Sequence, residues 1–323
     1  MKAVVIYEVG GPEVLKLEDR PIPHLEAGKV LIQVKAFGLN RSEMFTRLGH
    51  SKGKVFFPRI LGIECVGIVK ECHSGNFSPG QQVAVVMGGL GRQFDGSYAE
   101  YTLVPEEIVI PFTSSLDWPT LGAIPEMCQT ASGSLEQSLQ LKAGETLLIR
   151  GGTSSVGITA AQLAKNKGCI VYSTTRSMSK ANKLMDIGVD EIITDDGEIA
   201  PKIKALSPSG VDKVLELVGG NGIRDSLKCV KRGGIVCQTG YLSNQWRIDG
   251  FSPLGEIPSG VYLTSYQGGN ADLPPNLLQQ FIDQVEKGSL QIQIDQVFKL
   301  DQIVEAHSYM ESNKASGKLV VVT

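Results

Sequence analysis

The sequence predicts an α/β protein in which a mostly β unit is joined to a doubly wound parallel sheet. Up to about residue 120, short apolar runs are separated by Pro and Gly turns, which is typical of antiparallel strands. From about residue 121, apolar strands alternate with helical stretches, and this alternation predicts a parallel sheet with helices on both faces. The tail returns to the first unit in the simplest arrangement. We therefore expect one domain at 1–120 with 267–323 and another at 121–266.

Each expected element has its own apolar pattern. The strands of the first unit are, in order, VVIYEV, KVLIQVKAFGL, ECVGIVKEC, QQVAVVMGG and YAEYTLV. The second unit alternates TLLIR, the helix VGITAAQLAKNKG, CIVYSTT, the helix KANKLMDIG, EIIT, VDKVLELVGG, the helical stretch IRDSLKCVKRGG and IVCQTG. After GVYLTSY, the tail holds a helix near NLLQQFIDQVEKG, the strand IQIDQVFKL, a helix at QIVEAHSYMES and the strand KLVVVT.

Composition and charge exclude several classes of function. The chain has 323 residues, 42% hydrophobic and 20% charged, which suits two globular domains. The net charge of −3, without a local run of Lys or Arg, argues against a nucleic-acid partner. The N-terminal apolar run is too short for a signal peptide or a membrane span, so we expect no membrane partner. Six cysteines without close pairs predict a reduced, cytoplasmic protein.

The stretch TLLIRGGTSSVGITAAQLAKNKG reads as a strand, a glycine turn and a helix that ends at Gly168. A phosphate would bind at the start of that helix, where free backbone N–H groups meet the positive end of the dipole. In the GxGxxG register the residues are Gly152, Ser154 and Gly157, so a serine replaces the middle glycine. The expected cofactor contacts are Gly152, Thr153, Ser154, Ser155, Val156 and Gly157. A tight turn that serves only helix packing is the alternative.

The next strand end selects the dinucleotide. An acidic residue there would bind the ribose hydroxyls of NAD and repel an extra phosphate, but IVYSTTRSMSK contains no acid. It offers the hydroxyls of Ser173, Thr174 and Thr175 and the cations of Arg176 and Lys180. Because a guanidinium pairs well with a phosphate, this segment predicts NADPH as the cofactor. Alternatively, Arg176 and Lys180 are solvated residues at a helix entry.

With these motifs in view, the chain resembles the medium-chain dehydrogenase/reductase superfamily, and within it the zinc-free quinone oxidoreductase branch that includes zeta-crystallin. The resemblance covers essentially the whole length, through MKAVVI, GGPEVLKL, VLIQVKAFGLNRSE, FPRILGIECVGIV, GQQVAVV, GSYAEY, the glycine turn and SGKLVVV. It implies a GroES-like β domain completed by the C-terminal segment, a Rossmann domain, a cleft where cofactor and substrate meet, and a homodimer joined through the Rossmann domains.

The stretch LGIECVG places Glu64 beside Cys65 and raises the question of a metal. The zinc-dependent alcohol dehydrogenases of the superfamily carry GHE where this chain has Gly62, Ile63 and Glu64, and a cysteine where it has Asn40. Catalytic zinc needs about three protein ligands of His, Cys or carboxylate type, and isoleucine supplies none. We expect no metal, and Cys65 packed as a small apolar group.

Without zinc, hydrogen-bond donors must stabilise the charge that develops on the acceptor oxygen. The resemblance places Asn40, Glu43 and Arg47 toward cofactor or substrate, whereas Phe45 stands where many quinone oxidoreductases have a tyrosine. Other possible donors are Tyr98, Tyr241 and Tyr266, for each of which ordinary packing is the alternative. The catalytic candidates are Asn40, Arg47, Tyr241 and Tyr266. By resemblance, Asn40, Thr130, Val218, Thr239, Gly240, Tyr241, Ser265, Tyr266 and Lys318 contact the cofactor.

The sequence thus predicts an NADPH-dependent, zinc-independent oxidoreductase that transfers hydride to quinones or α,β-unsaturated carbonyl compounds. An enoyl-thioester reductase of the same fold is one alternative, and Phe45 argues against it because a proton-donating tyrosine is expected near that position. A non-catalytic NADPH-binding protein, such as a redox sensor, is the alternative from another class.

Overall fold

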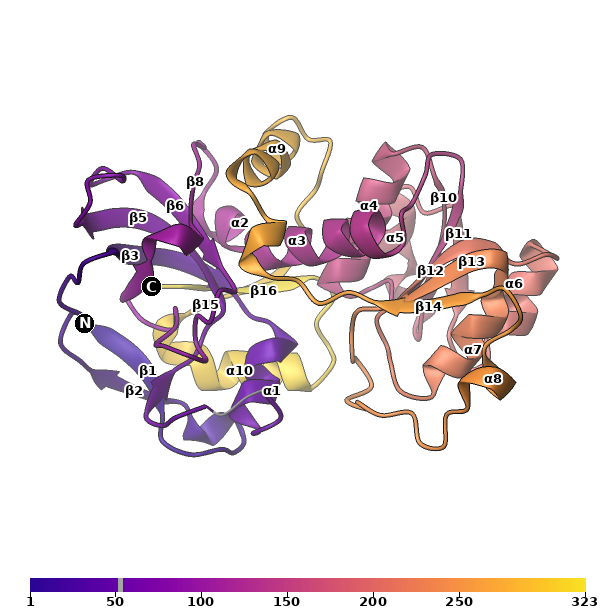
Figure 1. The fold of residues 1–323 in the computed structure, drawn as a ribbon, viewed down its shortest axis with the longest axis horizontal. Helices are drawn as coiled ribbons and strands as arrows, with labels where there is room; N and C mark the ends of the chain where they lie inside the picture. The colour runs from indigo at the N-terminus through magenta and orange to yellow at the C-terminus, as the bar shows by residue number, and fades with distance from the viewer. Residues whose placement is uncertain (52–54) are drawn as a thin grey trace. The chain divides into compact units, whose positions relative to one another are not determined.

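The computed structural model describes residues 1–51 and 55–323, which form two compact units (Figure 1). The first unit comprises Met1–Glu126, Gly269–Gly288 and Ile292–Thr323. The second comprises Met127–Gly268 and Ser289–Gln291. The first is mostly β and the second is a parallel α/β unit, so the predicted fold class is confirmed.

The first unit contains two sheets. The smaller has the order β2-β1-β4, and the larger has the order β15-β16-β3-β5-β6-β8, with β7 also paired to β3. The strands are β1 (Lys2–Ile6), β2 (Lys16–Asp19), β3 (Lys29–Gly38), β4 (Arg59–Ile60), β5 (Glu64–Cys72), β6 (Gln82–Val86), β7 (Tyr101–Pro105), β8 (Val109–Pro111), β15 (Ile294–Lys299) and β16 (Lys318–Val322). The antiparallel pairing of β16 with β3 brings the C-terminal strand beside one from the start of the chain.

Among its described residues, the first unit has the α-helices α1 (Arg41–Arg47), α2 (Trp118–Gly122), α9 (Pro275–Glu286) and α10 (Ile303–Glu311). Helix α1 begins directly after β3, and Asn40 is its N-cap. The backbone N–H of Asn40 donates to the carboxylate of Glu43 across 3.0 Å, one half of a capping box. This cap holds two polar side chains at the end of β3, inside the unit.

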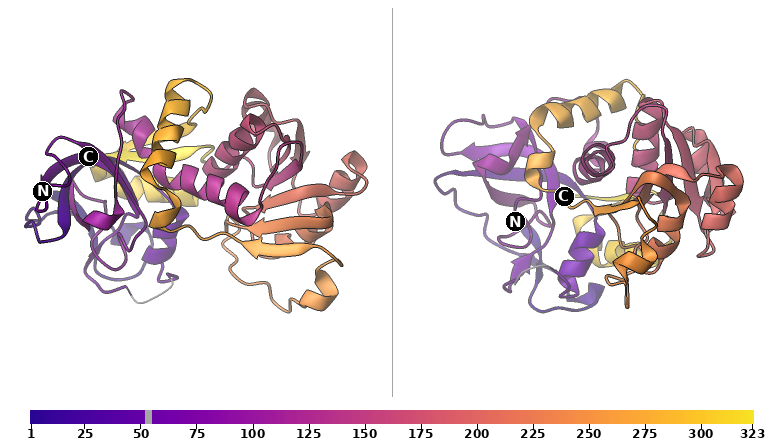
Figure 2. Two further views of the ribbon diagram at one scale, coloured as in Figure 1. Left: turned by 45° about the horizontal axis from the view of Figure 1, so that its top comes forward. Right: turned by 45° about the vertical axis from the view of Figure 1, so that its right-hand side comes forward.

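The second unit is a six-stranded sheet in the order β11-β10-β9-β12-β13-β14, and every pair in it is parallel. Its strands are β9 (Thr146–Arg150), β10 (Ile170–Thr175), β11 (Glu191–Thr194), β12 (Val211–Glu216), β13 (Val230–Gln238) and β14 (Tyr262–Ser265). Strand order reverses between β9 and β12, and ligands of open α/β sheets bind at the carboxyl ends of the strands beside such a point. Figure 2 shows this sheet from two further directions, with β14 in orange.

Helices cover both faces of that sheet, as the alternation of strands and helices predicts. The helices are α3 (Pro125–Gly133), which begins at the end of the first unit, α4 (Ser155–Asn166), α5 (Ala181–Asp186), α6 (Ala200–Leu206), α7 (Gly222–Cys229) and α8 (Pro253–Glu256). Alternate residues of β9 enter different cores: Leu147 and Ile149 pack with α3, α4 and α5, whereas Leu148 packs with α6 and α7. In the described part of the chain, no helix is both long enough and apolar enough to cross a membrane.

One expected element has different bounds. The stretch IRDSLKCVKRGG was assigned to a helix, but α7 ends at Cys229 and β13 already begins at Val230. A register shift in the pairing of β12 with β13 lies just after this point, and Gly233 has a φ of +84°. Lys231, Arg232 and Gly233 are exposed in this irregular start of the strand, so their polar character reflects solvent contact rather than a helical face.

Candidate functional site

The glycine turn joins β9 to α4 in the second unit. Gly151 has a φ of +90°, a conformation that side chains disfavour. Ser154 is the N-cap of α4: its Oγ accepts the N–H of Gly157 across 3.2 Å and donates to the carbonyl of Gly151 across 2.8 Å. The serine in place of the middle glycine of the motif therefore closes the turn and starts the helix.

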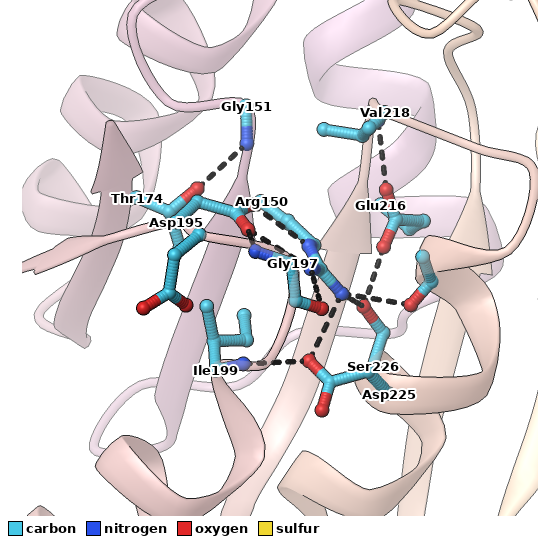
Figure 3. Close-up of polar contacts among 12 residues, drawn as sticks. Arg150, Gly151, Thr174, Asp195, Gly197, Ile199, Glu216, Val218, Asp225 and Ser226 are labelled. Carbon is cyan, nitrogen blue, oxygen red and sulfur yellow. Dashed lines mark hydrogen bonds and ion pairs between the residues drawn. The ribbon is translucent and has the colours of Figure 1, made fainter. Parts of the chain in front are cut away.

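Two further glycines allow close packing in this turn. A Cβ at Gly152 would overlap the hydroxyl of Ser173 on β10, and a Cβ at Gly157 would lie 2.7 Å from the carbonyl oxygen of Gly151. Thr174 also holds the turn, because its carbonyl accepts the N–H of Gly152 across 3.1 Å and its Oγ1 accepts the N–H of Gly151 across 3.0 Å (Figure 3). Close packing is thus one purpose of the glycines.

The start of α4 also offers donors for an anion. The amides of Ser155 and Val156 lie in the first helical turn, where no helix carbonyl can accept them, and the described residues supply no other acceptor. Both residues are half-buried. Their N–H groups and the helix dipole make this corner suited to a phosphate, in addition to its packing role.

The ends of three more strands lie at the same edge of this sheet. Glu216 of β12 pairs with Gln238 of β13, which pairs with Ser265 of β14, so the segments that follow these residues leave the sheet side by side. These strand ends and segments contain six of the residues that the resemblance assigns to the cofactor, namely Val218, Thr239, Gly240, Tyr241, Ser265 and Tyr266. The fold brings them to the edge where the glycine turn lies.

The side chains at this edge differ in their burial and in their contacts. The hydroxyl of Thr239 lies 2.9 Å from that of Ser134, which also donates to the carbonyl of Thr130. Tyr241 is half-buried and stacks on Trp246, with 4.4 Å between ring centroids. Tyr266 is only 8% exposed and packs over Gly133, where a Cβ would overlap its ring. Of the two tyrosines among the predicted catalytic residues, Tyr241 is therefore the more accessible.

The end of β10 presents hydroxyls and one exposed cation. Ser173 and Thr175 are buried, and Thr175 donates to the carbonyl of Ser177 across 2.9 Å. Ser173 Oγ has no hydrogen-bond partner among the described residues. Arg176 is exposed and Lys180 is half-buried. Arg176 thus directly follows β10, the strand that pairs with β9.

In the first unit, two predicted residues belong to a buried cluster of charges. The ammonium of Lys318 lies 2.6 Å from Asn40 Oδ1, 2.9 Å from Glu64 Oε1 and 3.5 Å from Glu126 Oε2. The amide of Asn40 donates to Glu64 across 2.9 Å, and Glu43 accepts the N–H of Ile63 across 3.2 Å. Lys318 is 2% exposed and Asn40 8%, so internal partners already bind both ends of the Asn40 carboxamide.

Burial sets the ionisation of this cluster. Desolvation, followed by repulsion from Glu64, raises the pKa of Glu43 to about 8. Desolvation also raises the pKa of Glu64, against the attraction of Lys318. Burial opposes the charge of Lys318, but Glu64 and Glu126 outweigh that effect and raise its pKa. Lys318 is therefore a fixed cation among oxygen atoms, whereas burial favours the protonated form of Glu43.

Arg47 and Tyr98, two of the predicted donors, lie in the interior of the first unit. The Arg47 side chain is fully buried, donates to the carbonyl of Gly10 across 2.6 Å and forms an ion pair with Glu311 of α10. Tyr98 is also fully buried; its hydroxyl lies 3.0 Å from His307 Nε2, and its ring stacks on Phe37. These contacts join α1, α10 and the sheets.

Several buried or half-buried polar residues at the sheet edge were not singled out from the sequence. Arg150, Asp195, Glu216, Asp225 and Ser226 form a connected network beneath the glycine turn (Figure 3). The available signal was a charged residue at the end of an apolar strand, as in TLLIR and VDKVLE. Such a residue reads equally well as a solvated strand end, so only the fold reveals its partners.

Two family models match the chain. The alcohol dehydrogenase GroES-like domain matches residues 26–114, and the zinc-binding dehydrogenase model matches residues 187–321. The quinone oxidoreductase of Sus scrofa is 30% identical over 331 residues, which cover 100% of this chain and 98% of that protein. The chain belongs to the quinone oxidoreductase branch of the medium-chain dehydrogenase/reductase superfamily. It is therefore a member of an oxidoreductase family.

Solved structures agree with this membership. The quinone oxidoreductase of Coxiella burnetii has a TM-score of 0.87 at 29% identity, covering 100% of this chain and 99% of that one. A structure described as an NAD-dependent alcohol dehydrogenase has a TM-score of 0.90 at 26% identity, with complete coverage of both chains. The same fold thus accompanies different named activities, and the choice of cofactor and substrate rests on the residues of this chain.

Proposed function

We propose that this protein is an NADPH-dependent, zinc-independent oxidoreductase that reduces quinones or α,β-unsaturated carbonyl compounds. The observation that carries the proposal is the pair of amides at Ser155 and Val156, which lack acceptors at the start of a helix. They lie at the carboxyl edge of a parallel sheet, where dinucleotides bind in this class of fold. Family membership supports the same activity.

The residues of the second unit fit a dinucleotide. The Gly152–Gly157 turn would hold the diphosphate, because its free amides and helix dipole match that charge. When bound, the reduced nicotinamide would supply the hydride. The proposed contacts of the remaining cofactor are Thr130, Ser173, Thr175, Arg176, Lys180, Val218, Thr239, Gly240, Tyr241 and Ser265, with Asn40 and Lys318 from the first unit.

The charge of one segment supports the proposed preference for NADPH. The segment 173–180 contains no acid that would repel a phosphate on the adenosine ribose, and Arg176 is an exposed guanidinium that can pair with it. Ser173 Oγ, buried without a partner among the described residues, offers a further hydroxyl in this segment. NADH lacks this phosphate, so it would leave the guanidinium of Arg176 without that partner.

The surroundings of Asn40 and Glu64 support the proposed zinc independence. No group of three or more His, Cys, Asp or Glu side chains in the described part of the chain could hold a metal ion. The oxygen atoms of Asn40, Glu64 and Glu126 surround the ammonium of Lys318, so a fixed organic cation already neutralises them. A metal ion would have to displace this charge.

A zinc-free site needs hydrogen-bond donors for the acceptor oxygen. Of the predicted catalytic residues, Tyr241 is the accessible donor, and we propose that its hydroxyl stabilises the charge that develops on that oxygen. The burial of Arg47 and Tyr266 and the internal bonds of Asn40 favour supporting roles for those three residues.

The proposed homodimer would form through the second unit. Strand β14 is an edge strand, and Tyr262 on it is 61% exposed.

The six cysteines are all free, which supports the reducing environment of the cytoplasm as the location.

The experiment is a turnover assay with purified protein, following NADPH absorbance with a panel of quinones and conjugated enones. Consumption of NADPH that depends on the acceptor, in protein without stoichiometric zinc, is the expected result. Tight NADPH binding without consumption of any acceptor would instead favour a binding protein. Preference for enoyl thioesters over free quinones would favour the enoyl-thioester reductase.

A further inference from the structure

Arg150 is the last residue of β9 and directly precedes the glycine turn. Its side chain is 2% exposed, although it is a full positive charge. Every nitrogen of its guanidinium donates to at least one acceptor within 3.1 Å. A buried cation with this complete set of partners is held in one orientation.

The guanidinium joins two segments at the carboxyl edge of the sheet (Figure 3). On one side, Nε and Nη2 bind both oxygens of Asp195, just after β11, across 2.8 and 3.0 Å. On the other side, Nη1 donates to the carbonyl of Gly222 and to Asp225 and Ser226 of α7, across 2.8 to 3.1 Å. Arg150 therefore links the end of β9 to the loop after β11 and to the start of α7.

The link continues to the turn after β12. Ser226 accepts a hydrogen bond from Arg150, and its own hydroxyl donates a hydrogen bond to Glu216, the last residue of β12. The other carboxylate oxygen of Glu216 accepts the N–H groups of Val218 and Gly219, across 2.7 and 3.0 Å. Each hydrogen bond has one possible direction while Glu216 is ionised, so the chain of contacts has a single arrangement.

The turn that these contacts hold is built on two glycines. Gly219 and Gly220 both have positive φ, +76° and +58°, and Glu216 is fully buried. Burial raises the pKa of Glu216, and the positive charge of Arg150 acts against that rise. Well-packed apolar residues can often replace a buried ionic network without loss of stability. A network that ends on two backbone amides at the cofactor edge indicates a role in geometry.

We propose that Arg150 is a positioning residue which, through Ser226 and Glu216, holds the Val218–Gly219 turn in the conformation that receives the dinucleotide. This inference rests on the proposed function, since it assigns the turn to the cofactor. Arg150 itself need not touch the cofactor. Its effect passes through the hydroxyl of Ser226 and the carboxylate of Glu216 to the two amides.

The test is the variant Ser226→Ala, which cuts the link while leaving Arg150 bound to Asp195. The dissociation constant for NADPH is measured by fluorescence titration well below the melting temperature, and we expect it to rise on the order of ten-fold. Amide hydrogen exchange of the cofactor-free protein should become faster at Val218 and Gly219. The control is Lys202→Met, which removes an ion pair with Asp196 in the same loop but lies outside the network.

A second variant keeps the test decisive if Ser226→Ala folds poorly. Glu216→Gln keeps the size of the side chain and an oxygen for the Val218 amide, but turns an acceptor toward Ser226 into a donor. This variant should also weaken the binding of NADPH and speed amide hydrogen exchange at Val218 and Gly219. A lower melting temperature with unchanged dissociation constant and unchanged exchange at Val218 and Gly219 would show a purely structural role and overturn the inference. Wild-type protein that binds neither NADPH nor NADH would instead refute the proposed function, and the inference with it.

Discussion

At the scale of single residues, small and polar side chains shape the glycine turn of the second unit. Ser154 shows how a residue that departs from the glycine motif still serves it, because its hydroxyl caps α4 while the amides of Ser155 and Val156 stay available. Gly152 has no room for a Cβ beside Ser173. Arg176, by contrast, is exposed, so its importance depends on a ligand rather than on the fold.

Replacing Arg176 therefore tests the cofactor preference directly. Arg176→Ala should weaken the binding of NADPH by about 1 to 3 kcal/mol, the contribution of a charge-assisted contact. It should leave the binding of NADH nearly unchanged. Fluorescence titration with both dinucleotides measures the difference. Lys183→Ala, which removes a nearby exposed cation on α5, serves as the control. Equal losses for both cofactors would show that Arg176 does not bind the ribose phosphate.

At the scale of elements, buried polar pairs fix helices to sheets in the first unit. Helix α10 carries His307, which is fully buried with Nε2 beside the hydroxyl of Tyr98. Its Nδ1 has no hydrogen-bond partner among the described residues. Burial, helped by the nearby charge of Arg47, lowers the pKa of His307 from 6.5 to about 3. The imidazole is thus neutral in the folded protein at all ordinary pH values.

This depressed pKa predicts a loss of stability in acid. Between pH 6.5 and pH 3, His307 is protonated in the unfolded chain but not in the folded protein. The free energy of unfolding therefore falls as the pH drops toward 3. The slope for one such group is about 1.4 kcal/mol per pH unit. Urea unfolding at several pH values, followed by the fluorescence of Trp118 in a Trp246→Phe background, measures the first unit alone.

The comparison that isolates the histidine is His307→Gln in the same background. Because glutamine does not titrate, the advantage of His307 over the variant should shrink steadily as the solution becomes more acidic. A difference between the two proteins that stays constant with pH would mean that His307 does not set the acid sensitivity.

At the scale of the whole molecule, the similarity to quinone oxidoreductases runs through both units, since the relative from Sus scrofa covers the entire chain. The exposed edge of β14 is where the proposed homodimer would form. Leu254 of α8 is 98% exposed, which is unusual for a leucine and is consistent with a partner surface in the second unit.

Light scattering tests this assembly. The wild-type protein should have twice the mass of one chain, and Leu254→Glu should shift it toward the monomer because a charge would be buried at the interface. Phe56→Glu changes an exposed apolar residue of the first unit and should leave the dimer intact. A wild-type mass equal to one chain would contradict the proposal.

Local patterns were sufficient to predict the fold class and the glycine turn. Alternating strands and helices predicted the parallel sheet, and the motif predicted a turn whose glycines the structure shows in close contact with their surroundings. The predicted end of the helix α7 was wrong, because Lys231 to Gly233 belong to the irregular start of β13, which has no clear periodicity. The Arg150 network was missed, since Arg150 lies 45 residues from Asp195 and 76 residues from Ser226 in the chain.

By itself, the sequence determined the order of elements, the start of α4 and the missing acid after β10, because each depends on residues that are neighbours in the chain. Only the tertiary structure decided which polar groups have partners. The buried ammonium of Lys318 among three oxygen atoms and the path from Arg150 to Val218 both arise where distant segments meet. Burial and long-range contact set the charge and orientation of these groups, and neither can be read from local spacing.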